Sequence, residues 1–244
     1  MKAKIDSFME ALGMAEYPVL FRYTDSLPED TLLPQEGKHV CVFALLEKTR
    51  AEGRPVALSA SRYGCAGGGY YLGFLDAPRE GIEYFLSCGI PGKMEGERYI
   101  KTPELARAKF AQMPVRPASG RYGLFTRADK SHFMEEPEIV IFFAAPDHLA
   151  GLHFLACYDR EGEAVTAPFS SGCGAFVAFP LAEAKRPEPR AVMGLFDPSA
   201  RPYVQANLLT FALPYSLFSR MAGNIPESFL GTKTWETIRK RTLG

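Results

Sequence analysis

The chain has 244 residues, of which 47% are hydrophobic and 23% are charged, and its 28 basic and 28 acidic residues give a formal net charge of zero. This composition argues against disorder, and the lack of a basic excess argues against a nucleic-acid binder. No stretch approaches the roughly 20 apolar residues that a membrane span needs. Five cysteines without a CxxC pair, behind a start that lacks the apolar core of a signal peptide, predict reduced thiols and a cytoplasmic protein.

Short apolar or alternating runs bounded by Gly, Pro or Asp predict strands, and helical spacing with capping signals predicts helices. In chain order we expect a helix at 5–12, a strand at 19–24, a helix at 39–51, a strand at 55–60, helices at 79–87 and 103–112, strands at 121–127 and 138–144, a helix at 147–159, strands at 164–169 and 191–196, and helices at 215–221 and near 233–241. The hairpin-like neighbours 121–127 and 138–144 beside helix-linked strands predict one α+β domain over residues 1–244.

Several segments recur in the same order. Gly123-Leu124-Phe125 and then Phe143-Ala144-Ala145-Pro146 are echoed by Gly194-Leu195-Phe196 and then Phe211-Ala212-Leu213-Pro214. The segments 45–53 and 154–162 also end alike, and each precedes a Gly-Cys sequence by about the same interval. Two interpretations remain open: an internal pseudo-twofold repeat, or chance matches in a sequence rich in Gly and Phe.

The densest local signal is the glycine-rich segment 61–70, directly after an expected strand. Glycines permit positive φ and close approach of a ligand, and their N–H groups can form a nest for an anion. Gly67 and Gly68 are the candidates for such a nest, and Arg62 could add a bidentate contact. The segment is neither a Rossmann nor a Walker motif. The alternative interpretation is a tight turn or bulge that serves packing alone.

Cys65 lies in this segment, and Cys173 lies in a similar one with Gly174. A thiolate among glycine amides could be a nucleophile, a redox centre or a metal ligand, whereas an isolated cysteine is commonly a small buried apolar residue. If the repeat is real, the two loops could face one another. Cys88 could then complete a metal site, although the spacings match no zinc or iron–sulfur signature.

A further candidate stretch is Leu195-Phe196-Asp197-Pro198-Ser199-Ala200-Arg201. Asp197 could act as an acid or base, and Arg201 could point toward an anion shared with the cysteine loops. The alternative is structural, because Asp-Pro followed by Ser is a common turn sequence.

With these motifs the chain resembles the domain of unknown function 169 family, also called ArCR, over nearly its whole length. The resemblance rests on Cys65 with Gly68 and Gly73, on Phe143…Pro146, on Cys173 with Gly174, and on Phe211…Pro214. Many members carry an Arg soon after the second Cys-Gly, where this chain has Ala175-Phe176. The resemblance implies a prokaryotic cytosolic protein and draws attention to the two cysteine loops, but it implies no activity.

Three functional hypotheses follow, and we favour the first. The protein could bind a small anionic ligand, a cofactor or a metal between the two loops, with no nucleic-acid or membrane partner. It could instead be an enzyme with a reactive Cys65 or Cys173. It could also be a homo-oligomeric scaffold with an interface at 211–218. The candidate ligand-binding residues are Arg62, Cys65, Gly67, Gly68, Cys173, Gly174, Asp197 and Arg201, and the candidate metal ligands are Cys65, Cys88 and Cys173.

Overall fold

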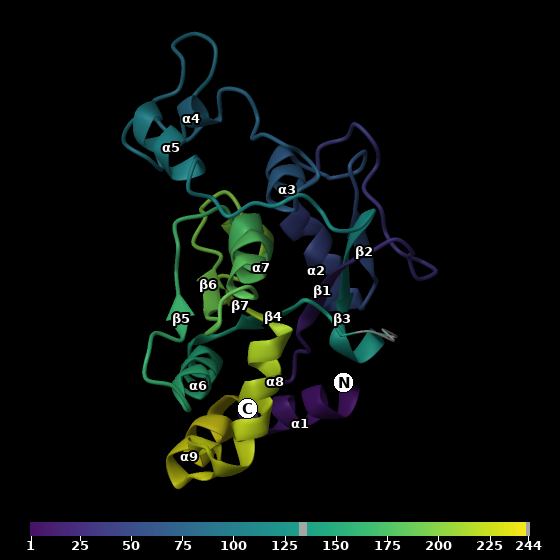
Figure 1. Ribbon diagram of the computed structural model, residues 1–244, viewed down its shortest axis with the longest axis vertical. Coiled ribbons are helices and arrows are strands. Elements are labelled where there is room, and N and C mark those ends of the chain that lie inside the picture. The colour runs from purple at the N-terminus through teal and green to yellow at the C-terminus, as the bar shows by residue number, and fades with distance from the viewer. Residues whose placement is uncertain (132–135, 243–244) are drawn as a thin grey trace.

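The computed structural model describes residues 1–131 and 136–242, which form a single α+β domain around one mixed sheet (Figure 1). The strand order is β2-β3-β1-β4-β7-β6-β5, and neighbours are antiparallel except for the parallel pair β5 and β6. The strands are β1 Val19–Thr24, β2 Val56–Leu58, β3 Tyr122–Arg127, β4 Ile139–Ala144, β5 Val165–Thr166, β6 Ala191–Gly194 and β7 Leu209–Pro214.

The α-helices are α1 Lys2–Leu12, α2 Val42–Glu52, α3 Ala66–Tyr71, α4 Ile82–Phe85, α5 Pro103–Phe110, α6 Pro146–Cys157, α7 Phe179–Glu183, α8 Tyr215–Asn224 and α9 Lys233–Thr242. A π-helical turn, η2 Gly174–Ala178, runs directly into α7. α5 begins as its sequence predicts: the Leu105 N–H donates to Thr102 Oγ1 at 3.2 Å, and Pro103 occupies the first turn. None of the helices in the described part of the chain has the length and apolar character needed to cross a lipid bilayer.

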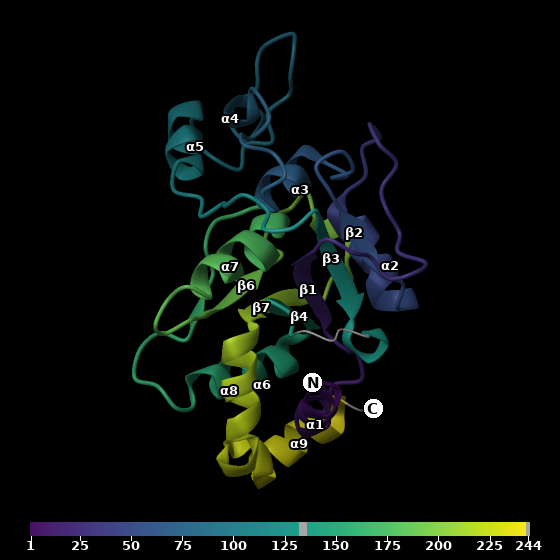
Figure 2. The ribbon, with the colours of Figure 1, turned by 45° about the vertical axis from the view of Figure 1, so that its right-hand side comes forward.

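The sheet carries a hydrophobic core on each face, because successive side chains of a strand point to opposite sides. Val140 and Phe142 of β4 pack with α1, α6 and α8, whereas Ile141 and Phe143 pack with α2, α3 and η2. Every residue of β4 is buried, as expected for a strand covered on both faces. Helices consequently lie on both sides of the sheet in the turned view (Figure 2).

Three expectations from the sequence are wrong. The strands 121–127 and 138–144 do not form a hairpin, because β1 lies between β3 and β4 and pairs with both. The segment 211–218 cannot be an interface, because Phe211 and Phe218 are fully buried in the core of one chain. Both Gly-Cys segments, expected as loops, are helix starts: Cys65 precedes α3, and Cys173 precedes η2.

Of the two repeated sequences, one occupies equivalent places in the fold and the other does not. The two Phe-x-x-Pro sequences end β4 and β7, which are antiparallel neighbours, and α6 and α8 follow them on the same face of the sheet. The Gly-Leu-Phe sequences are not equivalent. Phe125 is buried within β3, whereas Phe196 follows the end of β6 and is 52% exposed.

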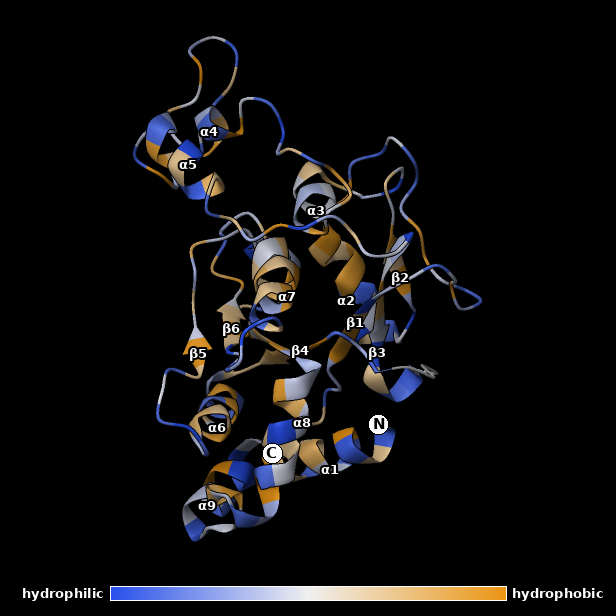
Figure 3. Ribbon diagram, viewed as in Figure 1, coloured by the Kyte–Doolittle hydropathy of each residue, from blue (hydrophilic) through white to orange (hydrophobic). Residues whose placement is uncertain are grey.

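Residues 74–117, here called the lobe, stand away from the sheet with α4 and α5 at their outer end (Figures 1 and 2). An ion pair of 3.0 Å between Arg107 and Glu83 joins these two helices. At the base of the lobe, the Ala118 N–H donates to the Gly73 carbonyl at 3.0 Å. The lobe therefore enters and leaves the body at adjacent points. Hydropathy colouring shows many hydrophilic residues on the lobe, whereas the first half of α2 is hydrophobic (Figure 3).

Candidate functional site

A pocket of about 630 Å³ lies where α3, the start of η2 and the segment after β6 meet the lobe. Its walls are mostly apolar and aromatic. Residues of the body that line it include Cys41, Phe43, Cys65, Gly67, Tyr70, Tyr71, Ser171, Cys173 and Asp197, and residues of the lobe that line it include Arg79, Ile82, Phe85, Tyr99, Lys109 and Phe110. The pocket thus contains both cysteines singled out by the sequence.

Local backbone geometry places Cys65 at the floor of the pocket. Gly64 has φ +74°, which only glycine adopts without strain, and its carbonyl accepts a hydrogen bond of 3.1 Å from the Val40 N–H. This contact brings the start of α2 beside the start of α3. Cys65 is the N-cap of α3, and its Sγ accepts a hydrogen bond of 3.3 Å from the Gly68 N–H.

Cys173 reaches the same floor from the other end of the chain. Gly174 follows it because any larger residue would collide: a Cβ there would lie 1.9 Å from Ser170 Oγ and 2.9 Å from the ring of Tyr71. The η2 turn that begins at Gly174 is π-helical, a rare conformation that is frequent at functional sites. Close packing between α3 and η2 therefore positions the second thiol.

The Cys173 thiol lies close enough to the Cys65 sulfur to act on its pKa as a hydrogen-bond donor. This interaction, together with the Gly68 and Val42 N–H groups and the nearby charge of His39, lowers the pKa of Cys65 to about 6 against the opposing effect of burial. The same interaction and burial raise the pKa of Cys173 well above its usual range. At pH 7 Cys65 is therefore mainly a thiolate and Cys173 a thiol.

The alkylation of Cys65 is expected to follow this ionisation. Because the thiolate is the nucleophile, the rate with iodoacetamide should rise with pH around a midpoint of about 6. Cys173→Ala removes the hydrogen-bond donor, so the midpoint should move up toward the ordinary value of about 8.5. Peptide mass spectrometry at Cys65 measures both profiles. Cys88→Ala, which changes an exposed thiol outside the pocket, serves as the control and should leave the Cys65 profile unchanged.

The two arginines expected to hold an anion do not line the pocket. Arg62 is exposed at the surface. Arg201 donates hydrogen bonds of 2.5 Å to the carbonyls of Leu208 and Ala206, so its guanidinium stabilises the turn before β7.

Asp197 lines the pocket in a structural role. Its carboxylate accepts hydrogen bonds from Ser199 and from the Gly172 N–H, the latter at 3.2 Å. The turn interpretation of Asp197 therefore describes its contacts, which also tie the segment after β6 to the start of η2.

The glycine amides do not form an open nest. Gly67 lines the pocket, whereas Gly68 and Gly174 are buried beside it. The Gly68 N–H donates to Cys65 Sγ, and the Gly174 N–H donates to Ser171 Oγ at 3.3 Å. Of these amides, that of Gly68 serves the Cys65 sulfur.

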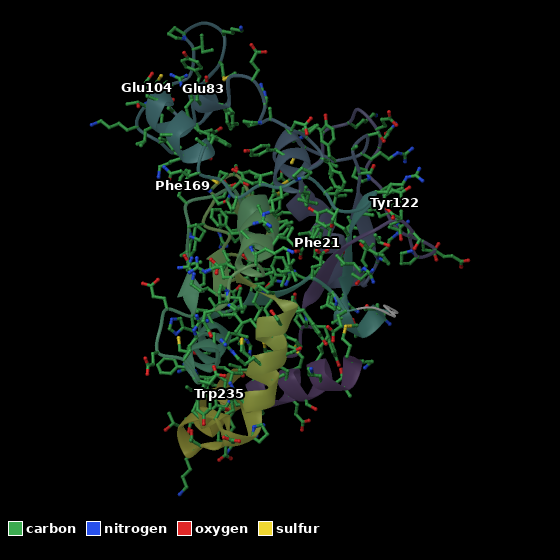
Figure 4. All side chains as sticks on the ribbon, in the orientation of Figure 1. Phe21, Glu83, Glu104, Tyr122, Phe169 and Trp235 are labelled. Carbon is green, nitrogen blue, oxygen red and sulfur yellow. The ribbon has the colours of Figure 1, made fainter. Side chains whose placement is uncertain are left out.

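Sequence reasoning missed the cations of the pocket, Arg79 and Lys109, both of which belong to the lobe. Arg79 makes no side-chain hydrogen bond or ion pair with any residue that the structure describes. The Lys109 ammonium lies 4.7 Å from the ring centroid of Phe169, which sits on the segment between β5 and η2 (Figure 4). No local motif marks either cation, since only the fold of the lobe brings them to the pocket.

The rim is aromatic. Phe169, Phe196 and Tyr203 line the pocket, yet each is between 44% and 52% exposed. Tyr99 of the lobe also reaches the segment after β6: burial and a hydrogen bond to Glu97 raise its pKa to about 12, and its hydroxyl also contacts Ser199. Large aromatic surfaces facing a cavity favour an apolar or planar ligand.

The structure does not bring together the three cysteines expected to bind a metal. Cys88 is exposed on the lobe, where its thiol donates to the Gly89 carbonyl at 3.5 Å, and it does not line the pocket. Across residues 1–131 and 136–242, no group of three His, Cys, Asp or Glu side chains is arranged to hold a metal ion. The thiol near Cys65 and Cys173 is instead Cys41, whose pKa is raised by burial.

Comparison with known proteins assigns the sequence that forms this site to a family. The family model DUF169, described as uncharacterised ArCR, matches residues 7–224, a range that includes α3, η2, the lobe and the pocket. No curated protein matches the chain, and no solved structure does.

Proposed function

We propose that this chain, which belongs to the DUF169 family of uncharacterised ArCR proteins, binds a small organic anion in the pocket between the body and the lobe. The observation that carries the proposal is an apolar cavity of about 630 Å³ with two lobe cations on its wall. Small-molecule sites commonly enclose roughly 300 to 1,000 Å³ and combine apolar walls with a few polar groups.

The walls suit a ligand with an aromatic or otherwise apolar body. Tyr70 and Phe110 form a tilted ring pair at 6.1 Å, and Ile82 and Phe85 face the same cavity from the lobe. Burying apolar ligand surface against such groups contributes about 25 cal/mol per Å². The rings at the rim can extend this contact.

The charges suit an anionic group on the lobe side. Arg79 has its guanidinium available, and Lys109 contacts Phe169 through a cation–π interaction that leaves its N–H donors for a ligand. Asp197 is the acidic residue of the described lining, and backbone and hydroxyl donors already compensate its charge. A carboxylate, sulfonate or phosphate near Arg79 would form charge-assisted hydrogen bonds.

Fluorescence titration with 1-anilinonaphthalene-8-sulfonate, an aromatic sulfonate, tests the proposal. The wild-type protein should bind one equivalent, and Arg79→Met and Lys109→Met should each weaken binding about tenfold, the equivalent of about 1.4 kcal/mol. Arg62→Met removes an exposed arginine outside the pocket and is the matched control. Equal affinities for all four proteins would reject the pocket as an anion site.

A further inference from the structure

We propose that Cys65 and Cys173 form a redox couple that undergoes thiol–disulfide exchange with small organic disulfides entering the pocket. The proposal rests first on position. The two residues are 108 positions apart in the chain, yet both line one cavity, where the Cys173 thiol acts on the Cys65 sulfur.

The two thiols differ in the way that an exchange reaction requires. Cys65 lines the pocket, is only partly buried, and has its sulfur surrounded by donors that favour the thiolate. Cys173 is 6% exposed, lines the same cavity, and has its pKa raised by Cys65. Cys65 is therefore the attacking group, and Cys173 is the resolving group.

The exchange balances in two steps. The Cys65 thiolate attacks one sulfur of a disulfide R–S–S–R, forms a mixed disulfide Cys65–S–S–R and releases R–S⁻. Cys173 then loses its proton to the released thiolate and attacks the Cys65 sulfur. This second step forms the Cys65–Cys173 bond and releases the second R–S⁻. The two protein thiols are oxidised, R–S–S–R is reduced to two thiols, and excess R–SH reverses the sequence.

The size of the cavity points to an organic disulfide as the partner. About 630 Å³ in contact with Cys65 is space for a molecule with substituents on both sulfurs. Cys41 is a third thiol in the lining and a competitor for the resolving step. Burial raises the pKa of Cys41, and its side chain makes no capping hydrogen bond at the start of α2. Cys173, rather than Cys41, is the thiol whose side chain interacts most strongly with Cys65, and this assigns the resolving role to Cys173.

Reaction with oxidised glutathione, followed by intact-protein and peptide mass spectrometry, tests the couple. The wild-type protein should lose two free thiols and yield a Cys65–Cys173 cross-linked peptide. Cys173→Ala should instead accumulate one glutathione on Cys65, and Cys65→Ala should form neither product. Cys41→Ala should behave like the wild type. A cross-link through Cys41, or a stable glutathione adduct on wild-type Cys65, would overturn the assignment.

The proposal of a redox couple and the proposal of an anion site can be tested independently. Hydroxyethyl disulfide carries no charge, so its exchange with Cys65 in the wild-type protein tests the thiol couple without engaging an anion site. Circular dichroism of each cysteine variant establishes that it is folded before its thiols are counted. A wild-type protein that exchanges but binds no sulfonate would reject only the proposed function, and one that binds sulfonate but does not exchange would reject only the redox couple.

Discussion

Replacement of Gly67 by phenylalanine is expected to abolish ligand binding while the fold stays intact. Gly67 lies in the first turn of α3 and lines the pocket, and no atom lies within 4 Å of a Cβ built on it. The new ring would therefore extend into the cavity without a clash and fill the space that a ligand needs. We expect the affinity for 1-anilinonaphthalene-8-sulfonate to fall by about 100-fold or more, equivalent to about 2.7 kcal/mol.

The stability of this variant should be unchanged or slightly higher. Gly67 does not have a left-handed φ, and glycine is less favourable within a helix than alanine by about 0.5–1 kcal/mol, with phenylalanine between the two. Gly223→Phe is the matched control, because Gly223 is exposed in α8, has equally open space around its Cβ position and lies outside the pocket. Full binding by Gly67→Phe, or equal losses in both variants, would contradict a ligand site at α3.

Gly73→Ala is expected to have the largest effect on stability. Gly73 has φ +69°, and a Cβ there would lie 1.9 Å from the Arg116 carbonyl oxygen and 2.7 Å from the Ala118 nitrogen. Because both obstacles are backbone atoms, the two ends of the lobe would have to separate. The left-handed conformation costs about 1–2 kcal/mol and the overpacking about 1–3 kcal/mol more. Urea denaturation should therefore show a loss of about 3 kcal/mol.

Gly37→Ala separates these two contributions. Gly37 has nearly the same backbone angle, φ +70°, but nothing lies within 4 Å of its Cβ position. Only the conformational cost of about 1–2 kcal/mol should remain there. If both variants lose the same stability, the close approach at the base of the lobe is not a constraint. A larger loss for Gly73→Ala, accompanied by weaker sulfonate binding, would link the base of the lobe to the pocket.

Most secondary structure follows from local patterns. Val19–Thr24 is a strand with the expected bounds, and α5 starts at the predicted Thr102-Pro103 cap. Two helix starts were missed because their composition opposes helix formation. Glycine-rich sequences such as 66–71 have low helix propensity, and packing against α2 and η2 outweighs that preference. The strand at Leu209–Pro214 was missed because its apolar run continues directly into α8, so no turn separates the two elements.

Some residues of the candidate site could also be selected from the sequence, and others could not. Cys65 and Cys173 could be selected in advance because glycines surround both, and glycine is needed where elements approach closely, as Gly174 does against Tyr71. Arg62 and Arg201 were selected for proximity in the chain, and this criterion was wrong. The cations that line the pocket, Arg79 and Lys109, lie in a lobe whose path no local motif reveals.

Local chemistry thus determined the α+β class, the bounds of several elements and the two cysteine segments, because propensity and glycine geometry act over a few residues. Long-range pairing decided the rest. It placed β1 between β3 and β4, buried 211–218 in the core, and joined two thiols that are far apart in the chain. The low pKa of Cys65 is a product of that meeting, since its largest cause is a hydrogen bond from a residue that only the folded chain brings near.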